Sequence, residues 1–202
     1  MSSAIQDVGQ TLVDLLRANL GQIVTDPDDE IVLLSPVEAL KVTGVRLSLF
    51  LYSVAPAVEL RNEMEIPGNT AADEAVSMPL DLYYLLTVFT PPVGGDTPTA
   101  RTLESHMLLG HAMRVLFDNG TLTGSLLRGE LPREEELRLT LQPMTVEDLT
   151  RIWSVFPESI LHTSVSYLVT PVRLRSNRNR GGRAVVERGA DVDHLVPKPA
   201  EV

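Results

Sequence analysis

The sequence predicts an α+β fold, with a mixed, mainly antiparallel sheet, about three helices and a flexible C-terminal arm. Two patterns lead to this fold class. Apolar residues recur at every second position in some segments, which is typical of strands, and three or four positions apart in others, which is typical of helices. The strands do not alternate strictly with the helices, so α+β is favoured over a doubly wound parallel sheet. The 202 residues suffice for one domain with its own core.

The first predicted element is an amphipathic helix over residues 3–20. A serine at its start can cap it, and Gly21 ends it. An acidic turn at 25–30 follows, and then a short apolar run at 31–34 that is closed by Pro36. The apolar side chains that share one face of the helix are Ile5, Val8, Leu12, Leu15 and Leu16.

Two strands are predicted next. Residues 45–52 alternate in strand fashion, and a long connection leads to a second strand over 78–89. One face of the second strand is entirely apolar, while Asp81 and Thr87 lie on the other face among aromatic and aliphatic residues. Because this other face is only partly polar, we expect the strand to be central in its sheet or covered by another subunit.

The second half of the chain continues the alternation of patterns. Thr145 and Asp148 stand at the spacing of a capping box, with Asp in place of the usual Glu or Gln, and they predict a helix start. In chain order, the elements are a helix over 100–117, a strand over 137–142, a helix over 145–156 and a long strand over 162–174.

The charge is spread unevenly along the chain. From Arg173 to Val202 there are seven basic and four acidic residues, a balance of +3, which leaves −13 on the rest of a chain whose net charge is −10. We expect one domain over residues 1–174 and a basic, flexible arm over 175–202. An acidic domain repels nucleic acid over most of its surface. The arm can meet an acidic partner, such as the domain of another copy.

The composition excludes several classes of protein. There is no cysteine, which rules out disulfides, thiolate catalysis and cysteine-ligated zinc, and this absence suits a reducing cytoplasm. The first residues lack the pattern of a signal peptide. No apolar run approaches the ~20 residues of a membrane-spanning helix. The pattern is that of a folded, soluble protein that is not secreted.

The residues that could carry chemistry do not form a recognisable site. His106 and His111 lie five positions apart on a predicted helix and do not share a face, and no third metal ligand accompanies His111 and Glu104. The stretch around Ala112 resembles the nucleophile turn of hydrolases, but alanine stands in the nucleophile position. No phosphate-binding glycine motif and no complete calcium loop is present.

One statistical oddity is a cluster of arginines near the C-terminus. A solvated tail and a surface that docks onto an acidic protein both explain such a cluster, and arginine favours paired contacts with carboxylates or phosphates. Nucleic-acid binding by such an arm usually brings interleaved aromatic residues, which are missing here. The cluster comprises Arg173, Arg175, Arg178, Arg180 and Arg183.

Five longer strings follow one another in the chain: LSLFLYSVAPAVELRN (47–62), LDLYYLLTVFT (80–90), ESHMLLGHAMRVLFDNGTL (104–122), LRLTLQPMTVEDLTRIWSVF (137–156) and LHTSVSYLVTPVRL (161–174). In this order they resemble the cap, or tail-terminator, proteins of phage-tail-like contractile injection systems of the antifeeding-prophage type. The resemblance covers nearly all of residues 1–174.

The resemblance implies a structural subunit and not an enzyme, with no catalytic residue, cofactor or metal. It implies a homo-hexameric ring at the end of the particle far from the baseplate, where the ring closes the inner tube and binds the last sheath layer. The implied partners are the inner tube protein and the sheath protein, with no small-molecule substrate, no nucleic acid and no membrane insertion. Assembly is expected in the cytoplasm, into a particle that is released or stays in the cell.

A ring of identical subunits needs two different complementary surfaces on each copy. A terminal strand with an arm can supply one of them by pairing with the sheet edge of a neighbour, so we expect residues from about Tyr167 to Val186 to reach a neighbouring subunit or the sheath. Two alternatives remain: a stand-alone module that binds an acidic partner or nucleic acid through the arm, and an enzyme that uses His106, Glu104 or Asp81. The expected contact residues are Tyr167, Val169, Arg173, Arg175, Arg178, Arg180 and Arg183.

Overall fold

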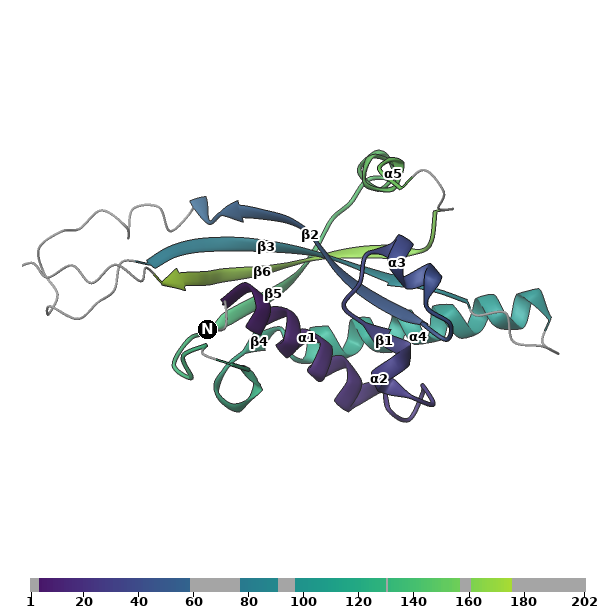
Figure 1. Cartoon of the computed structure of the whole chain (residues 1–202), viewed down its shortest axis with the longest axis horizontal. Coiled ribbons are helices and arrows are strands. Elements are labelled where there is room, and N and C mark those ends of the chain that lie inside the picture. The colour runs from purple at the N-terminus through teal and green to yellow at the C-terminus, as the bar shows by residue number, and fades with distance from the viewer. Residues whose placement is uncertain (1–3, 59–76, 91–96, 130, 157–160, 176–202) are drawn as a thin grey trace, which may run out of the picture.

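The computed structural model describes residues 4–58, 77–90, 97–129, 131–156 and 161–175. They form a six-stranded sheet with the order β1-β2-β3-β6-β5-β4, in which only β1 and β2 are parallel. Figure 1 shows α1 and α4 on one side of this sheet and α5 on the other. We call the side of α1 and α4 the inner face and the side of α5 the outer face. The predicted fold class, α+β with a mainly antiparallel sheet, is confirmed.

The three predicted helices are present as α1 (Ala4–Leu20), α4 (Pro98–Asp118) and α5 (Val146–Ser154). Two further short helices, α2 (Pro27–Glu30) and α3 (Pro36–Lys41), bring the described part of the chain to five α-helices. Proline stands at the start of both short helices, where its missing N–H costs nothing. Side chains of the preceding residues cap them: Asp26 accepts from the Asp28 N–H, and Ser35 forms a capping box with Glu38.

Four of the strands match the predicted alternating segments: β2 (Leu47–Pro56), β3 (Ser77–Val88), β5 (Leu137–Gln142) and β6 (Ser164–Arg175). The two-residue strands β1 (Ile31–Val32) and β4 (Thr121–Leu122) were not expected. β3 pairs with β2 on one side and β6 on the other, so of the two predicted alternatives the central place in the sheet is confirmed.

The main core lies between the inner face of the sheet and the helices α1 and α4. Alternate residues of β3 point into it, and α1 contributes a face of nine buried residues among its 17. Tyr84 is the largest fully buried side chain, with an exposed fraction of 1%. The β3 residues in this core are Leu80, Leu82, Tyr84, Leu86 and Val88.

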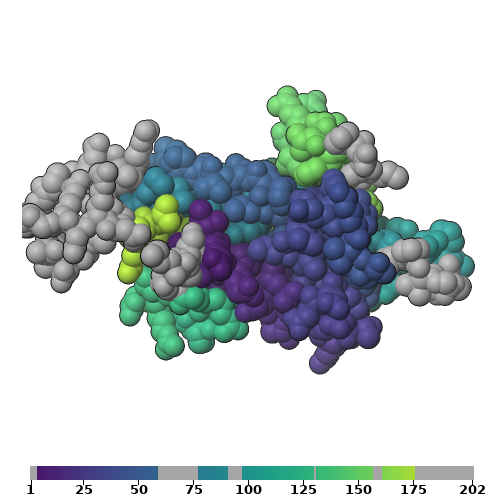
Figure 2. All heavy atoms as spheres, viewed as in Figure 1, coloured from purple at the N-terminus to yellow at the C-terminus, as the bar shows by residue number. Residues whose placement is uncertain are grey.

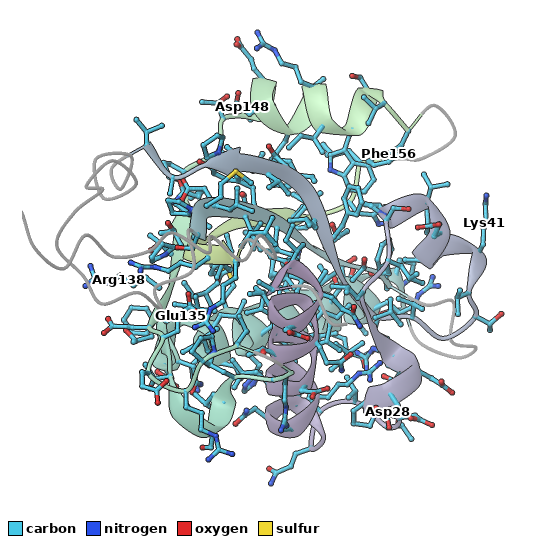
Figure 3. All side chains as sticks on the ribbon, turned by 60° about the vertical axis from the view of Figure 1, so that its left-hand side comes forward. Asp28, Lys41, Glu135, Arg138, Asp148 and Phe156 are labelled. Carbon is cyan, nitrogen blue, oxygen red and sulfur yellow. The ribbon has the colours of Figure 1, made fainter. Side chains whose placement is uncertain are left out.

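The outer face is built differently. Hydroxyl groups pair across its strands: the Tyr52 and Ser166 oxygens lie 2.9 Å apart, as do those of Thr87 and Ser164. α5 (Val146–Ser154) is attached to this face through rings. Phe156, which follows α5 and is labelled in Figure 3, meets Phe50 of β2 edge-on and contacts Trp153 of α5, both at 6.1 Å between ring centroids. In the described part of the chain, the outer face is therefore held mainly by polar pairs and aromatic contacts, which include Tyr52 with Tyr83 at 6.1 Å between ring centroids.

Candidate functional site

Two of the expected contact residues are part of the subunit's own core. Tyr167 and Val169 are exposed by only 4% and 0%, and both belong to the main apolar cluster. Their strand, β6, pairs with β3 along its length and with β5 from Ser166 to Thr170, so neither edge is open there. This corrects the expectation for these two residues: a central strand cannot present them to a neighbour.

The arginine cluster begins where β6 leaves the sheet. Arg173 and Arg175 are exposed, and their positive charges lie near Glu135 of the β4–β5 connection, which Figure 3 labels. Burial raises the pKa of the Glu135 carboxyl, and the two arginine charges oppose this rise. The remaining arginines of the predicted contact set, Arg178, Arg180 and Arg183, lie outside the described residues, so the arm over 175–202 stays a prediction.

The residues that an enzyme would use are not gathered together. Glu104 of α4 forms an ion pair with Arg46, with 2.5 Å between the carboxylate Oε1 and guanidinium Nη2. Asp81 accepts a hydrogen bond from Thr170 on the outer face, whereas α4 covers the inner face. His106 is exposed on α4. Within the described ranges, no group of three or more His, Asp or Glu side chains could hold a metal ion.

Arg46 instead ties three elements together. Its guanidinium lies 3.7 Å from Oε2 of Glu30 in α2, in addition to its contact with Glu104 in α4. The side chains of Arg46 and Glu30 are exposed by only 11% and 13%. Oε1 of Glu30 accepts from the backbone N–H groups of Thr25 and Asp26. This network fixes α2 and α4 to the start of β2, which is a structural task.

The surface offers apolar features that the sequence patterns did not single out. Three apolar side chains on one side of α4 are exposed: Leu103 by 62%, Met107 by 49% and Phe117 by 84%. Gly110 lies on the same side, and, apart from its chain neighbours and the helix's own backbone, no described atom lies within 4 Å of the position that a Cβ would take there. A second feature is the outer edge of β2. The signal for that edge was in the sequence, since residues 47–58 contain no charged side chain. Exposed apolar surface of this kind is typical of sites where proteins contact one another.

The described helices include none that is both long and apolar enough to cross a membrane.

No curated protein matches the chain.

Two solved structures share the fold. One is the sheath/tube terminator, in its extended state, of an extracellular contractile injection system, PVC; it has a TM-score of 0.63 and 18% identity, over 97% of this chain and 64% of that chain. The other is the tube-terminating cap of the anti-feeding prophage, with a TM-score of 0.58 and 17% identity, over 92% of this chain and 60% of that one. The chain thus spans less than two thirds of the length of either protein.

The two solved structures show the fold, and a family model shows to which family the chain belongs. The model of the Pvc16 N-terminal domain matches residues 7–188, which is most of the chain and extends from α1 past the end of β6. The predicted resemblance to the cap and terminator proteins of antifeeding-prophage-type systems is confirmed, and the chain belongs to the Pvc16 N-terminal domain family.

Proposed function

We propose that this protein is the cap of a contractile injection particle, where it closes the inner tube and ends the sheath. The observation that carries the proposal is that 97% of the chain superposes on a protein described as a sheath/tube terminator, while the family model spans residues 7–188. The second similar structure is also described as a tube-terminating cap. The proposed partners are therefore the inner tube protein and the sheath protein of the same particle.

The proposed assembly is a homo-hexameric ring at the end distal to the baseplate. A closed ring of identical subunits requires two different surfaces that fit each other. The described residues offer uncharged and apolar surfaces, along the β2 edge and on α4. The basic C-terminal arm over 175–202, with a net charge of +2 against −12 on the rest of the chain, supplies a surface of the opposite charge.

The proposed role requires no catalysis. Glu104 forms an ion pair with Arg46, and Asp81 accepts a hydrogen bond from Thr170 of the neighbouring strand, so both carboxylates have structural partners. A cap acts by fit and by blocking further addition of subunits, which the surfaces described above allow. We place its assembly in the cytoplasm, as part of a particle that carries the cap at one end.

The test is to remove the gene and to image the particles by electron microscopy. If the protein terminates tube and sheath, the particles lacking it have uncontrolled length or do not accumulate, and the wild-type gene restores a single length. Particles of normal length and normal closed ends in the deletion strain contradict the proposal. Native mass spectrometry of caps detached from particles tests the ring separately, since a hexamer is expected.

A further inference from the structure

β2 is the outermost long strand on its side of the sheet. Its neighbour β1 pairs only with Leu47 and Ser48, so from Leu49 to Pro56 the outer side of β2 has no strand partner within the described ranges. In Figure 2 the blue atoms of this strand follow the upper margin of the molecule, beside α5. Backbone N–H and C=O groups of alternate residues therefore face outward along this margin, where another strand could pair with them.

The chemistry of this edge does not discourage pairing. Native proteins protect open edges with charged side chains, but residues 47–58 contain none. Val54 and Val58 are exposed by 45% and 71%. Within β2 itself, the features that protect an edge are a bulge between Leu51 and Ser53 and the proline that ends the strand. An unpaired edge of this length, with no charged residue on it, is a typical site at which another strand is added to a sheet.

The opposite margin of the sheet shows the contrast. β5 carries Arg138 on its ladder, pairs with β4 at Leu137 and Arg138, and donates from the Leu139 N–H to the Gly120 carbonyl at 2.8 Å. A charge and a covering segment thus protect this edge, as is usual. β2 differs in that its unpaired stretch from Leu49 to Pro56 is longer and carries no charged residue at all.

The chain itself contains a segment of the required kind. β6 ends at the same end of the sheet as β2, because Arg175 pairs with Ser77 and Leu80 pairs with Pro56. In the arm beyond Arg175, residues 183–188 (RAVVER) hold the only pair of adjacent β-branched residues, flanked by glycines on both sides. The seven residues between, 176–182, span up to about 23 Å when extended, which is several strand spacings.

We propose that residues 183–188 of one copy add as a strand to the β2 edge, Leu49–Pro56, of the adjacent copy. This inference rests on the proposed function, because it is the contact that a closing ring needs: the arm of each subunit is the donor and its β2 edge is the acceptor, two different surfaces. Backbone pairing gives the contact its affinity. The opposite net charges of the arm over 175–202 and of the domain over 1–174, +2 and −12, favour the encounter.

The absence of cysteine from the chain makes a direct test possible. Purified particles are prepared with the double variants Val54→Cys/Val185→Cys and Val54→Cys/Val186→Cys, so that either strand register is covered. Directly opposed residues on paired strands have Cβ atoms close enough for a disulfide. Mild oxidation is then expected to join cap subunits into a covalent ladder on a non-reducing gel, and reduction is expected to remove it.

The matched control places the first cysteine on the other margin of the sheet. Thr140→Cys/Val185→Cys uses an exposed position of β5 and the same arm residue. We expect about tenfold less cross-linked cap than with Val54→Cys, because only paired strands give a high effective concentration of the two thiols. Equal ladders from both variants overturn the proposal. So does a disulfide within one chain, or a covalent product that contains cap and another protein but no second cap.

The same variants distinguish this inference from the proposed function. If the cap protein is missing from purified particles, the proposed function fails. Mixtures of single variants Val54→Cys and Val185→Cys or Val186→Cys in solution then decide the pairing. A mixed covalent dimer that exceeds the Thr140→Cys control about tenfold supports contact between copies, and its absence overturns it. If the cap is present on the particles and no ladder forms, only the strand pairing is wrong.

Discussion

The two faces of the sheet differ in what holds their helices. On the inner face, nine of the 17 residues of α1 are buried, and six of the nine belong to a continuous apolar core. On the outer face, Trp153 is the one buried residue among the nine of α5, which is attached through aromatic rings. The same alternating strands serve both faces. The comparison teaches that the inner face supplies most of the apolar burial that stabilises the fold, and the outer face supplies little of it.

The largest effect is expected from a cavity on the inner face. Leu16→Ala removes a side chain of α1 that is 0% exposed, so the free energy of unfolding should fall by about 2–5 kcal/mol. Urea denaturation followed by circular dichroism measures the change. The control Val146→Ala, on α5 where Val146 is 75% exposed, should change stability by less than about 0.5 kcal/mol. Similar losses in both variants would contradict the division between the two faces.

Alkaline pH should lower the stability of the fold by ionising a tyrosine that is buried on the inner face. Burial raises the pKa of the Tyr84 hydroxyl far above its usual range. Since the unfolded chain has the ordinary value near 10, the contribution to stability is full below that pH and is lost as the pH rises from there toward the folded value. Tyr84→Phe should therefore show a smaller fall in its urea midpoint above pH ~10 than the wild type. The residual fall should come in part from Tyr167, whose pKa burial also raises. An unchanged alkaline profile in Tyr84→Phe would refute this explanation.

A smaller and local effect is expected on the outer face. Phe156→Ala removes two ring contacts, one with Phe50 and one with Trp153, each with 6.1 Å between ring centroids. Each such contact contributes about 0.5–1.5 kcal/mol, so α5 should open more often without global unfolding. Amide hydrogen exchange should become faster in residues 146–154 and stay unchanged in α1. Equal acceleration in both helices would show that α5 is part of the main cooperative unit.

The smallest effect concerns the start of α5 at acid pH. Hydrogen bonds from the side chain and backbone of Thr145 hold the pKa of Asp148 below its usual value. A lowered pKa means that the contribution to stability is full above the unfolded value, near 3.9, and is lost as the pH falls through the folded one. Amide exchange of α5 should accelerate in this acid range. Asp148→Asn should remove that pH dependence, and a dependence that persists in the variant would exclude Asp148 as its cause.

The longer elements could be predicted because their patterns are local. The period of α1, the alternation of β3 and β6 and the Thr145–Asp148 capping box each depend on neighbours within a few residues, and all are present in the structure. The shorter helices and strands were not predicted, because they contain too few residues to show a periodic pattern. Pro36 was interpreted as the end of an apolar run, whereas it is the first residue of α3, which Ser35 caps. The two-residue strands β1 and β4 carry no period of their own.

By itself, the sequence determined the fold class, the long helices and strands and the family to which the resemblance pointed, and it left open whether β3 is central in its sheet or covered by another subunit. Only the tertiary structure decided the strand order, and with it the burial of Tyr167 and Val169, the open edge of β2 and the joining of Glu30, Arg46 and Glu104. The physical reason is that periodicity tells which side chains share a face, whereas the partners of each edge are set by contacts between segments far apart in the chain.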